Sequence, residues 1–235
     1  MAPIDEAEAV FWDIGGVVLD LESVQAVQRR FVDRLVVEYD SPVDAEDAHE
    51  RFRQTVGDYF RERDGTAFRP AREGYRRGVD AILVPDAETV PWRPLLRRLQ
   101  AESVEANPDA VAAIESLAET PLHQGVVSDV DHEEGEFLLD ELGVRDALDS
   151  YTSSEAVGRT KPDPATFEAG LDRAGVDPER AVMIGDRYEH DVAGAKRVGL
   201  VTVAYGADDG PAADYHLSDL RALPALLGVD ETATR

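Results

Sequence analysis

The feature that most constrains the fold is a regular alternation of helix-like and strand-like segments after Asn107. Apolar runs of strand length are separated by amphipathic stretches, a pattern typical of right-handed βαβ units. The expected helices cover residues 108–119, 133–142, 164–175, 189–199 and 220–228, and the expected strands cover 123–129, 149–154, 181–186 and 200–206. The pattern predicts an α/β fold with a Rossmann-like, mostly parallel sheet and helices on both faces. Such sheets bind ligands at the carboxyl ends of their strands.

The N-terminal part of the chain has a different pattern. A short apolar run, AVFW, ends in Asp13 and predicts a buried strand. Between Ser23 and Leu99 no comparable strand-like run follows. Instead, apolar residues recur at three-to-four spacing over residues 23–39, 44–63 and 68–83. This spacing predicts an all-helical insertion between the first strand and the rest of the sheet.

The composition restricts the classes of partner. Asp and Glu number 49 against 24 Lys and Arg, so the formal net charge is −25. Such a surface repels phosphate backbones and anionic lipids, so we expect no nucleic acid and no membrane as a partner. The chain has no cysteine, no apolar run long enough to span a bilayer, and acidic residues where a signal peptide needs basic ones. We therefore expect a cytoplasmic protein without disulfides.

The acidic residues are spread along the whole chain, and Lys161 and Lys196 are its only lysines. Dispersed acidity with scarce lysine resembles the surface chemistry of salt-adapted proteins. The composition therefore predicts a halophilic protein whose fold needs molar salt to screen its self-repulsion.

Side chains with useful chemistry lie at or just after the ends of the expected strands. Asp13 ends the first strand, where a carboxylate can be a nucleophile, a metal ligand or only a turn cap. Ser128 ends the next one, and its hydroxyl with the backbone amide of Asp129 can form a phosphate-binding corner. Ser and Asp are also common helix caps, so this second position alone is weak.

Two further positions follow the later strands. Lys161 lies in GRTKPDP; a lone lysine is usually a solvated charge, but this chain otherwise uses arginine, which indicates a need for a compact ammonium. Asp186 and Asp191 flank the turn after the apolar VMI run. Two acids there suit a hard cation such as Mg²⁺, whereas helix capping accounts for only one of them.

In their order and spacing these motifs resemble the haloacid dehalogenase-like (HAD) superfamily, over residues from Glu8 to about Gly206. FWDIGGVV is similar to the first motif of that family, Ser128 to the second, GRTKPDP to the third and IGDRYEHD to the fourth. A helical insertion directly after the first motif resembles the family's α-helical cap. The resemblance implies an α/β hydrolase core formed by residues 1–20 and 92–235, and a small all-helical cap formed by residues 21–91.

The resemblance also implies a Mg²⁺-dependent phosphomonoester hydrolase that acts on a small phosphorylated metabolite. Asp13 would attack phosphorus in line and form a phospho-aspartyl intermediate, which water then hydrolyses. The cap would close over the site and read the rest of the substrate. The implied metal ligands are Asp13, the backbone carbonyl of Gly15, Asp186 and Asp191, and the implied phosphoryl ligands are Ser128, the Asp129 amide and Lys161.

The chain departs from the family pattern at Gly15, where most phosphatases of the family have a general acid–base aspartate. Glycine keeps the backbone carbonyl but loses the proton transfer, a role worth ~100- to 10,000-fold. The loss argues against a sugar phosphomutase and predicts a steep dependence of rate on leaving-group acidity. Asp20, Glu22 and His132 are candidates to replace this acid, although each is more simply explained as a surface charge.

Two rival functions stay open. A 2-haloacid dehalogenase needs neither the acid nor a metal, but that branch usually carries an aromatic residue at position 15 and lacks the metal-binding acid pair. A non-catalytic HAD-fold binding protein would have no need to keep the acids and the lysine of the motifs. In the insertion, four arginines could contact a second anionic group of a substrate or pair with acids on their own helices. These are Arg61, Arg63, Arg69 and Arg72.

Overall fold

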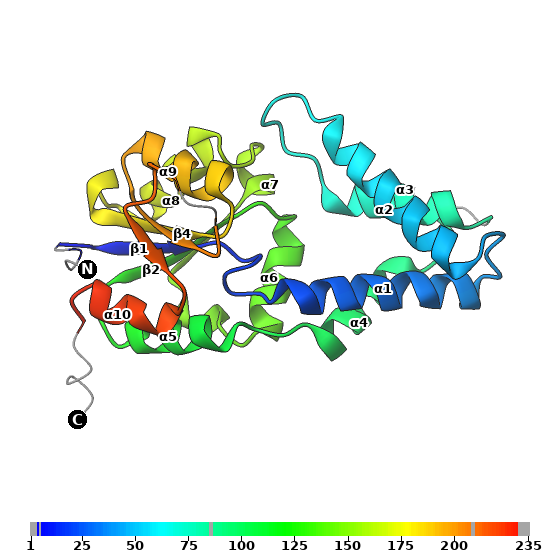
Figure 1. Ribbon diagram of the computed structural model, residues 1–235, viewed down its shortest axis with the longest axis horizontal. Coiled ribbons are helices and arrows are strands. Elements are labelled where there is room, and N and C mark those ends of the chain that lie inside the picture. The colour runs from blue at the N-terminus through cyan, green and yellow to red at the C-terminus, as the bar shows by residue number, and fades with distance from the viewer. Residues whose placement is uncertain (1–3, 5, 85–86, 208–209, 230–235) are drawn as a thin grey trace. The chain divides into compact units, whose positions relative to one another are not determined.

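The computed structural model describes residues 4, 6–84, 87–207 and 210–229, and the chain divides into two compact units. An α/β unit comprises residues 1–20 and 106–235, and a helical unit comprises Leu21–Glu105. The described part of the α/β unit contains a fully parallel six-stranded sheet with the order β3-β2-β1-β4-β5-β6 (Figure 1). Its strands are β1 (Ala9–Trp12), β2 (His123–Ser128), β3 (Ser150–Ser153), β4 (Ala181–Gly185), β5 (Val201–Tyr205) and β6 (Tyr215–Leu217).

Helices cover both faces of the sheet, which confirms the predicted α/β class (Figure 1). One face carries α8 and α9, and the opposite face carries α5 and α10. The helices of this unit are α5 (Pro108–Ala118), α6 (His132–Glu141), α7 (Ser154–Val157), α8 (Pro164–Ala174), α9 (Ala193–Val198) and α10 (Leu223–Leu226). Short 3₁₀ turns are η1 (Arg145–Ala147), η2 (Pro178–Arg180) and η4 (Leu220–Ala222), and η3 (Tyr188–Val192) is a π-helical turn.

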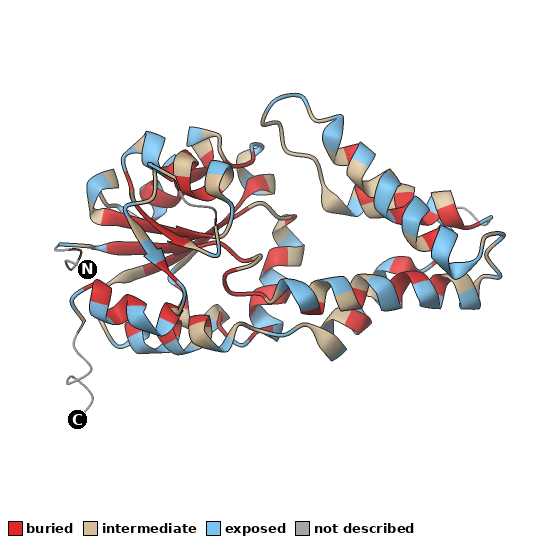
Figure 2. Cartoon of the chain, viewed as in Figure 1, coloured by how far each residue is buried: buried red, intermediate tan, exposed pale blue. Residues whose placement is uncertain are grey.

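The core of the α/β unit follows from the strand sequences. All four residues of β1 are buried, and Figure 2 shows the central strands as mostly buried between partly exposed helices. On one face Phe11 and Met183 pack with Phe167 of α8 and Ala195 of α9. A strand buried on both faces has no polar positions, which explains why AVFW does not alternate.

The strand register brings the ends of the central strands to one level. Trp12 pairs with Val126 of β2 and with Ile184 of β4, so the next residue, Asp13, lies level with Val127 and Gly185. The chain runs outward from β1 to β3 and then returns to β4 on the other side. The reversal of strand order between β1 and β4 is the place where open α/β sheets bind ligands.

The segments by which the chain leaves the α/β unit and returns to it are joined by hydrogen bonds. Leu19 forms an antiparallel bridge with Ala106, and the backbone N–H of Asn107 donates to the carbonyl of Val18 at 2.8 Å. The side-chain amide of Asn107 donates to the carbonyl of Val17 at 3.0 Å, while its oxygen caps α5. The base of the insertion is therefore fixed by hydrogen bonds inside the α/β unit.

The helical unit consists of α1 (Leu21–Glu38), α2 (Ala45–Arg61), α3 (Ala71–Ile82) and α4 (Trp92–Ser103). Phe31 of α1 lies at its centre, with ring centroids 5.9 Å from Phe52 and 6.4 Å from Trp92. Gly78 of α3 lets α2 approach closely, because a Cβ there would lie 2.6 Å from the Phe52 ring. The three-to-four spacing of the apolar residues thus forms a core inside this unit.

The helical unit extends further than the predicted cap of residues 21–91. It begins at Leu21 but continues to Glu105, so α4 belongs to it and not to the α/β core predicted over 92–235. The cause is packing: Trp92, Leu95 and Leu99 are buried in the same cluster as Phe31. An amphipathic segment such as WRPLLRRLQ shows which face is apolar, but not which unit covers that face.

Candidate active site

Asp13 is buried at the end of β1, and its two carboxylate oxygens have different surroundings. Oδ1 lies 2.9 Å from the N–H of Ile14, 2.7 Å from Oγ of Ser128 and 3.0 Å from Nζ of Lys161. Oδ2 has a more distant neighbour, Nη2 of Arg187, at 4.0 Å. The sheet therefore presents one carboxylate oxygen that is held by three donors and one that is available for reaction.

Lys161 is entirely buried beneath this carboxylate. Its ammonium lies 3.0 Å from the carbonyl of Val127, 3.0 Å from Oδ1 of Asp13 and 2.6 Å from Oδ1 of Asp191. Burial opposes the charge of Lys161, but attraction to Asp13 and Asp191 prevails and raises its pKa above the ordinary value. A cation held so firmly keeps two nearby carboxylates in place.

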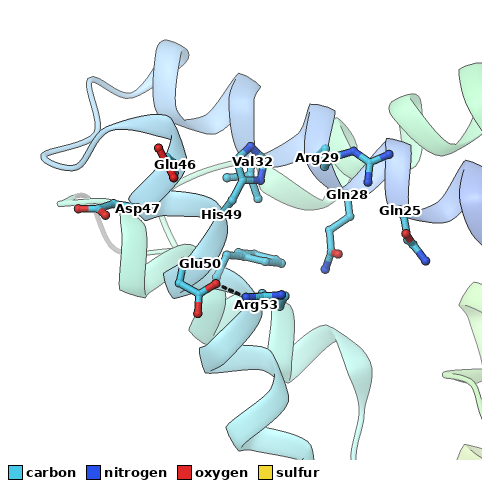
Figure 3. A pocket seen from close by; sticks show the side chains of 10 residues that line it. Gln25, Gln28, Arg29, Val32, Glu46, Asp47, His49, Glu50 and Arg53 are labelled. Carbon is cyan, nitrogen blue, oxygen red and sulfur yellow. Dashed lines mark hydrogen bonds and ion pairs between the residues drawn. The ribbon is translucent and has the colours of Figure 1, made fainter.

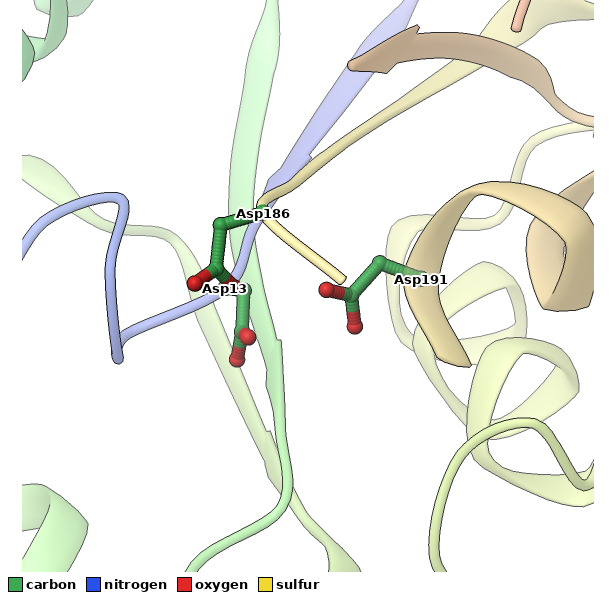
Figure 4. Close-up of side chains that lie close together, drawn as sticks. All are labelled: Asp13, Asp186 and Asp191. Atoms are coloured by element: carbon green, nitrogen blue, oxygen red, sulfur yellow. The ribbon is translucent and has the colours of Figure 1, made fainter. Parts of the chain in front are cut away.

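Asp13, Asp186 and Asp191 form a cluster at the ends of β1 and β4 (Figure 4). Each offers a carboxylate oxygen, and these atoms lie within 4.8 Å of one another. Oδ1 of Asp186 is buried and accepts no hydrogen bond from the described residues. Since an unpaired buried carboxylate oxygen is costly and hard cations prefer oxygen ligands, the donor set fits Mg²⁺.

The local backbone explains how these acids come so close. Gly16 adopts a φ of +76°, and a Cβ there would lie 2.0 Å from Oδ2 of Asp186. Gly185 leaves room for Asp191, because a Cβ there would lie 2.1 Å from the Asp191 Cβ. The π-helical turn η3 brings Asp191 inward, where its Oδ2 accepts the N–H of Arg187 at 2.9 Å. The segment predicted as one helix over 189–199 is thus a π turn followed by α9, and π turns are frequent at functional sites.

Burial, together with repulsion between the carboxylates, raises pKa values in this cluster. Burial raises the pKa of Asp186 to about 6, and the charges of Asp13 and Asp191 add to the rise. Burial also raises the pKa of Asp13, against the opposing effect of Lys161. A divalent cation at this position would favour the ionised forms of Asp13 and Asp186.

Asp129 has a role beyond the backbone amide considered from the sequence. Its Oδ1 accepts from Oγ of Ser154 at 2.6 Å and from the N–H of Lys161 at 2.8 Å, and its Oδ2 accepts from Nη2 of Arg187 at 2.9 Å. His190 Nδ1 lies 3.6 Å from the same Oδ2. Burial opposes the charge of Asp129, but these donors and cations outweigh it and hold the pKa below its usual range. The Asp129 carboxylate therefore joins the segments after β2, β3 and β4.

Most side chains selected from the sequence converge at this edge of the sheet, namely Asp13, Ser128, Asp129, Lys161, Asp186 and Asp191. Gly15 lies in the turn after Asp13, and its carbonyl stays a predicted metal ligand. Sequence reasoning missed Arg187 and His190. Both residues lie between the two acids of the fourth motif, and a basic residue there could have indicated a role in the site. The sequence interpretation used these positions only as spacers between the acids.

The candidate replacement acids have other surroundings. The ring of His132 stacks on Tyr151 with centroids 5.1 Å apart, and its Nδ1 lies 3.0 Å from Oγ of Ser153. Glu22 lies exposed in the first turn of α1, and Asp20 is the last residue before the insertion. None of these placements identifies a proton donor for the leaving group.

The arginines of the insertion have partners within the helical unit. Arg61 pairs with Asp58, Arg63 lies over the ring of Phe60, and the Arg69 guanidinium lies 3.9 Å from the ring centre of Tyr59. Arg72 also interacts with other residues of the structure. Pairing with an acid therefore describes Arg61 and also Arg69, whose Nη2 lies 3.5 Å from Oε2 of Glu62, and stacking on an aromatic ring describes Arg63 and Arg69.

A hollow of about 630 Å³ lies between α1 and α2 of the helical unit (Figure 3). Its lining carries charges of both signs; Arg53 pairs with Glu50, and His49 lies 2.8 Å from Asp33. Its charged residues are of both signs and several are exposed, so the hollow differs from the close, largely buried carboxylate cluster of Asp13, Asp186 and Asp191. Separately, no helix within the described residues is long and apolar enough to cross a membrane.

Comparison with known proteins gives an independent result. A model of the haloacid dehalogenase-like hydrolase family matches residues 7–199. Glyceraldehyde 3-phosphate phosphatase of Methanothermobacter thermautotrophicus is 22% identical over 86% of both chains. Ribulose-1,5-bisphosphate 5-phosphatase of Halopiger xanaduensis is 33% identical over 56% of this chain and 52% of its own length. The matches to three of the relatives span only 41%, 52% and 44% of the relative's length.

Solved structures agree with the fold. A HAD phosphatase from Thermococcus onnurineus is 27% identical, with a TM-score of 0.76 over 95% of this chain and 99% of its own. A 2-haloacid dehalogenase from Pseudomonas syringae is 23% identical, with a TM-score of 0.71 over 94% and 98%, and this similarity shows the fold alone. The family match covers most of the chain, and the sheet carries the acids and the lysine of its motifs. The chain therefore belongs to the haloacid dehalogenase-like hydrolase family.

Proposed function

We propose that this protein is a Mg²⁺-dependent phosphomonoester hydrolase that works through a phospho-aspartyl intermediate on Asp13. The observation that best supports this function is the carboxylate cluster of Asp13, Asp186 and Asp191 beside the buried ammonium of Lys161. A nucleophile alone would need no further acids. The extra carboxylates are of use to a reaction that places a cation against a phosphate.

In the proposed reaction, Asp13 supplies the nucleophile. Oδ1 is held by Ile14, Ser128 and Lys161, so Oδ2 attacks phosphorus and forms an acyl-phosphate as the ester P–O bond breaks. The leaving oxygen takes its proton from water, because Gly15 offers no acid. A second water then hydrolyses the acyl-phosphate, which releases inorganic phosphate and restores the carboxylate.

Asp13, Asp186, Asp191 and the carbonyl of Gly15 are the groups that would hold Mg²⁺. The ion would supply charge stabilisation for the phosphoryl oxygens and reduce the repulsion between the carboxylate and phosphate. The residues themselves contribute position: Gly16 and Gly185 allow the close approach, and Lys161 restrains two of the acids.

We propose a small phosphorylated metabolite as the substrate. The named relatives act on glyceraldehyde 3-phosphate, ribulose-1,5-bisphosphate and phosphoglycolate, which are all small organic phosphates. We further propose that the helical unit Leu21–Glu105 acts as the cap that selects among them. Dehalogenation of a 2-haloacid is disfavoured by the acid cluster, for which a reaction at carbon without a metal has no use.

Phosphate release from a panel of esters, with and without Mg²⁺, tests this function. Asp13→Asn should lower the rate by about 10,000-fold or more, as loss of a covalent nucleophile does in other hydrolases. Asp146→Asn, on the surface turn η1, is the control and should leave the rate unchanged. If no ester is hydrolysed, or if Asp13→Asn retains activity, the phospho-aspartyl mechanism is wrong for this chain.

We also propose that the protein is halophilic and works in a salt-rich cytoplasm. The support is the net charge of −25, which must be screened for the folded state to persist. Melting in 0.1 M and 3 M potassium chloride measures this requirement, and a clear rise in melting temperature with salt is expected. An unchanged melting temperature would contradict the proposal.

A further inference from the structure

The buried lysine of the site supplies its positive charge at Oδ1 of Asp13. An ammonium has three N–H groups, and Lys161 faces three acceptors, on Val127, Asp13 and Asp191. Its side chain is 0% exposed. A phosphoryl group that reaches Oδ2 of Asp13 would gain from a second cation on the Oδ2 side of the carboxylate.

Arg187 lies on that side. Its Nη2 lies 4.0 Å from Oδ2 of Asp13 and 3.8 Å from Oδ1 of Asp191, and its side chain is 42% exposed. Asp129 holds the guanidinium in place through the 2.9 Å contact with Nη2. Nη2 carries a second N–H, and no hydrogen bond joins Nη1 or Nε to another of the described residues, so the guanidinium keeps donors for an incoming anion.

We propose that Arg187 is a phosphoryl-binding residue, held by Asp129, which donates to a non-bridging oxygen of the phosphoryl group that Asp13 attacks. This role rests on the proposed phosphatase function. The geometry supports it because an attacking oxygen approaches phosphorus to about 3–3.5 Å, which brings the phosphoryl oxygens within reach of a nitrogen 4.0 Å from Oδ2. Arginine suits this position, since its planar fork binds phosphate through two parallel hydrogen bonds.

The simpler explanation is that Arg187 only pairs with Asp129 to stabilise the fold. An ion pair with Asp129 alone would use one guanidinium nitrogen and would not require Arg187 to lie near the nucleophile. The guanidinium instead lies near three carboxylates of the site, those of Asp13, Asp129 and Asp191. The two explanations differ in what a neutral side chain would change: binding of phosphate in the first, stability and metal binding in the second.

The experiment compares Arg187→Met and Arg187→Lys with the parent protein. Calorimetric titration measures the affinity of the Mg²⁺-loaded protein for inorganic phosphate, and a separate titration measures Mg²⁺ affinity. Arg180→Met is the matched control, because Arg180 is 40% exposed and pairs with Glu8 at 2.9 Å away from the cluster. None of these readouts requires turnover.

Arg187→Met should weaken phosphate binding about 10- to 100-fold, the usual effect of losing a charge-assisted hydrogen bond. Mg²⁺ affinity should stay equal or rise, since a cation near the acids has gone. The phosphate affinity of Arg187→Lys should lie between those of Arg187→Met and the parent protein, and the phosphate affinity of Arg180→Met should match that of the parent. Phosphate affinity within twofold of the parent in Arg187→Met, or a joint loss of phosphate affinity, Mg²⁺ affinity and melting temperature, overturns the assignment.

The outcome is separable from that of the proposed function. If the parent protein releases phosphate from esters but Arg187→Met binds phosphate normally, only the role of Arg187 fails. If the parent protein binds phosphate and Arg187→Met does not, yet no ester is hydrolysed, only the hydrolytic function fails. A parent protein without measurable phosphate affinity overturns the role of Arg187, and the proposed function fails with it only if no ester is hydrolysed.

Discussion

The ammonium of Lys161 lies 2.6 Å from Oδ1 of Asp191, and both side chains are fully buried. The protein has one other lysine, Lys196, which pairs with Asp214 at 2.5 Å but is 43% exposed. The chain therefore offers an internal comparison between a buried ion pair and an exposed one, built from the same residue types.

Lys161→Met should be strongly destabilising. It leaves Asp13 and Asp191 buried without their cation, and breaking a buried ion pair on one side costs about 3–5 kcal/mol. Lys196→Met removes an exposed pair and should cost about 0–1 kcal/mol. Urea unfolding of both variants, without metal and at constant potassium chloride, measures the difference. Equal losses in the two variants would show that the buried contact contributes no more than the surface pair.

Gly16→Ala should weaken Mg²⁺ binding without preventing folding. The new Cβ would lie 2.0 Å from Oδ2 of Asp186 and must displace that carboxylate. Disturbing the support of a metal ligand lowers metal affinity about 10- to 100-fold. Gly143→Ala is the control, because its φ of +72° carries the same backbone strain but nothing lies near its Cβ. Calorimetric Mg²⁺ titration should separate the two variants, and a similar Mg²⁺ affinity in both would contradict the close contact.

The absence of an acid at Gly15 should make the rate of hydrolysis depend on the leaving group of the ester. The rate of hydrolysis should fall steeply from aryl to alkyl phosphates, because Gly15 supplies no proton to the leaving oxygen. Gly15 has a negative φ, unlike Gly16, so an aspartate can adopt its backbone conformation. Gly15→Asp should raise the rate on alkyl esters by ~100-fold or more and leave aryl esters nearly unchanged. A parent protein with a flat dependence on leaving-group pKa already contains a replacement acid.

The ion pairs of Glu73 should give the helical unit a pH-dependent contribution to stability. Hydrogen bonds from Arg76 and Arg77 lower the pKa of this carboxylate from 4.5 to about 2. A carboxylate whose pKa is lowered in the folded state stabilises the protein at pH values above its pKa in the unfolded state. This contribution is therefore present at pH 7 and is lost as the pH falls from about 4.5 toward 2.

The measurement is the difference in unfolding free energy between the parent protein and Glu73→Gln at pH 7 and pH 3. Since the groups are largely solvated, the difference at pH 7 should be about 1 kcal/mol or less, and it should shrink at pH 3. Glu115→Gln, an exposed glutamate of α5 without an ion pair in the described structure, controls for the loss of one negative charge. A difference that grows toward pH 3 has the wrong sign for this mechanism.

The α/β fold was predictable because apolar runs of strand length alternate with amphipathic stretches after Asn107, and three of the strand-like runs lead to a candidate site residue. Asp13, Ser128 and Asp186 follow apolar runs. Parallel pairing brings the carboxyl ends of these strands to one edge of the sheet, independently of the loops that connect them. Strand β6 was not predicted, because Tyr215–Leu217 has three residues and an exposed centre. A strand that short lacks a periodic signal.

The limits of α4 and the role of Arg187 depend on contacts that sequence patterns do not encode. Trp92 marks an apolar helix face, but its partner Phe31 lies far away in the chain. Arg187 comes directly after a motif acid in the sequence. Its position beside Asp13 and Asp129 becomes visible only once the π turn that follows it is known. Local propensity determined the elements, whereas tertiary packing determined these neighbours.

The bridge between Leu19 and Ala106 has a consequence for how this chain can vary. Because the insertion starts and ends at that bridge, the polypeptide between them is, in topological terms, one surface loop that carries its own core. The entropy cost of closing a loop rises only with the logarithm of its length. Descendants of this chain can therefore lengthen, shorten or exchange the loop while the register of the strands that hold Asp13 and Asp186 stays as it is, so the proposed cap and the proposed catalytic site can be inherited separately.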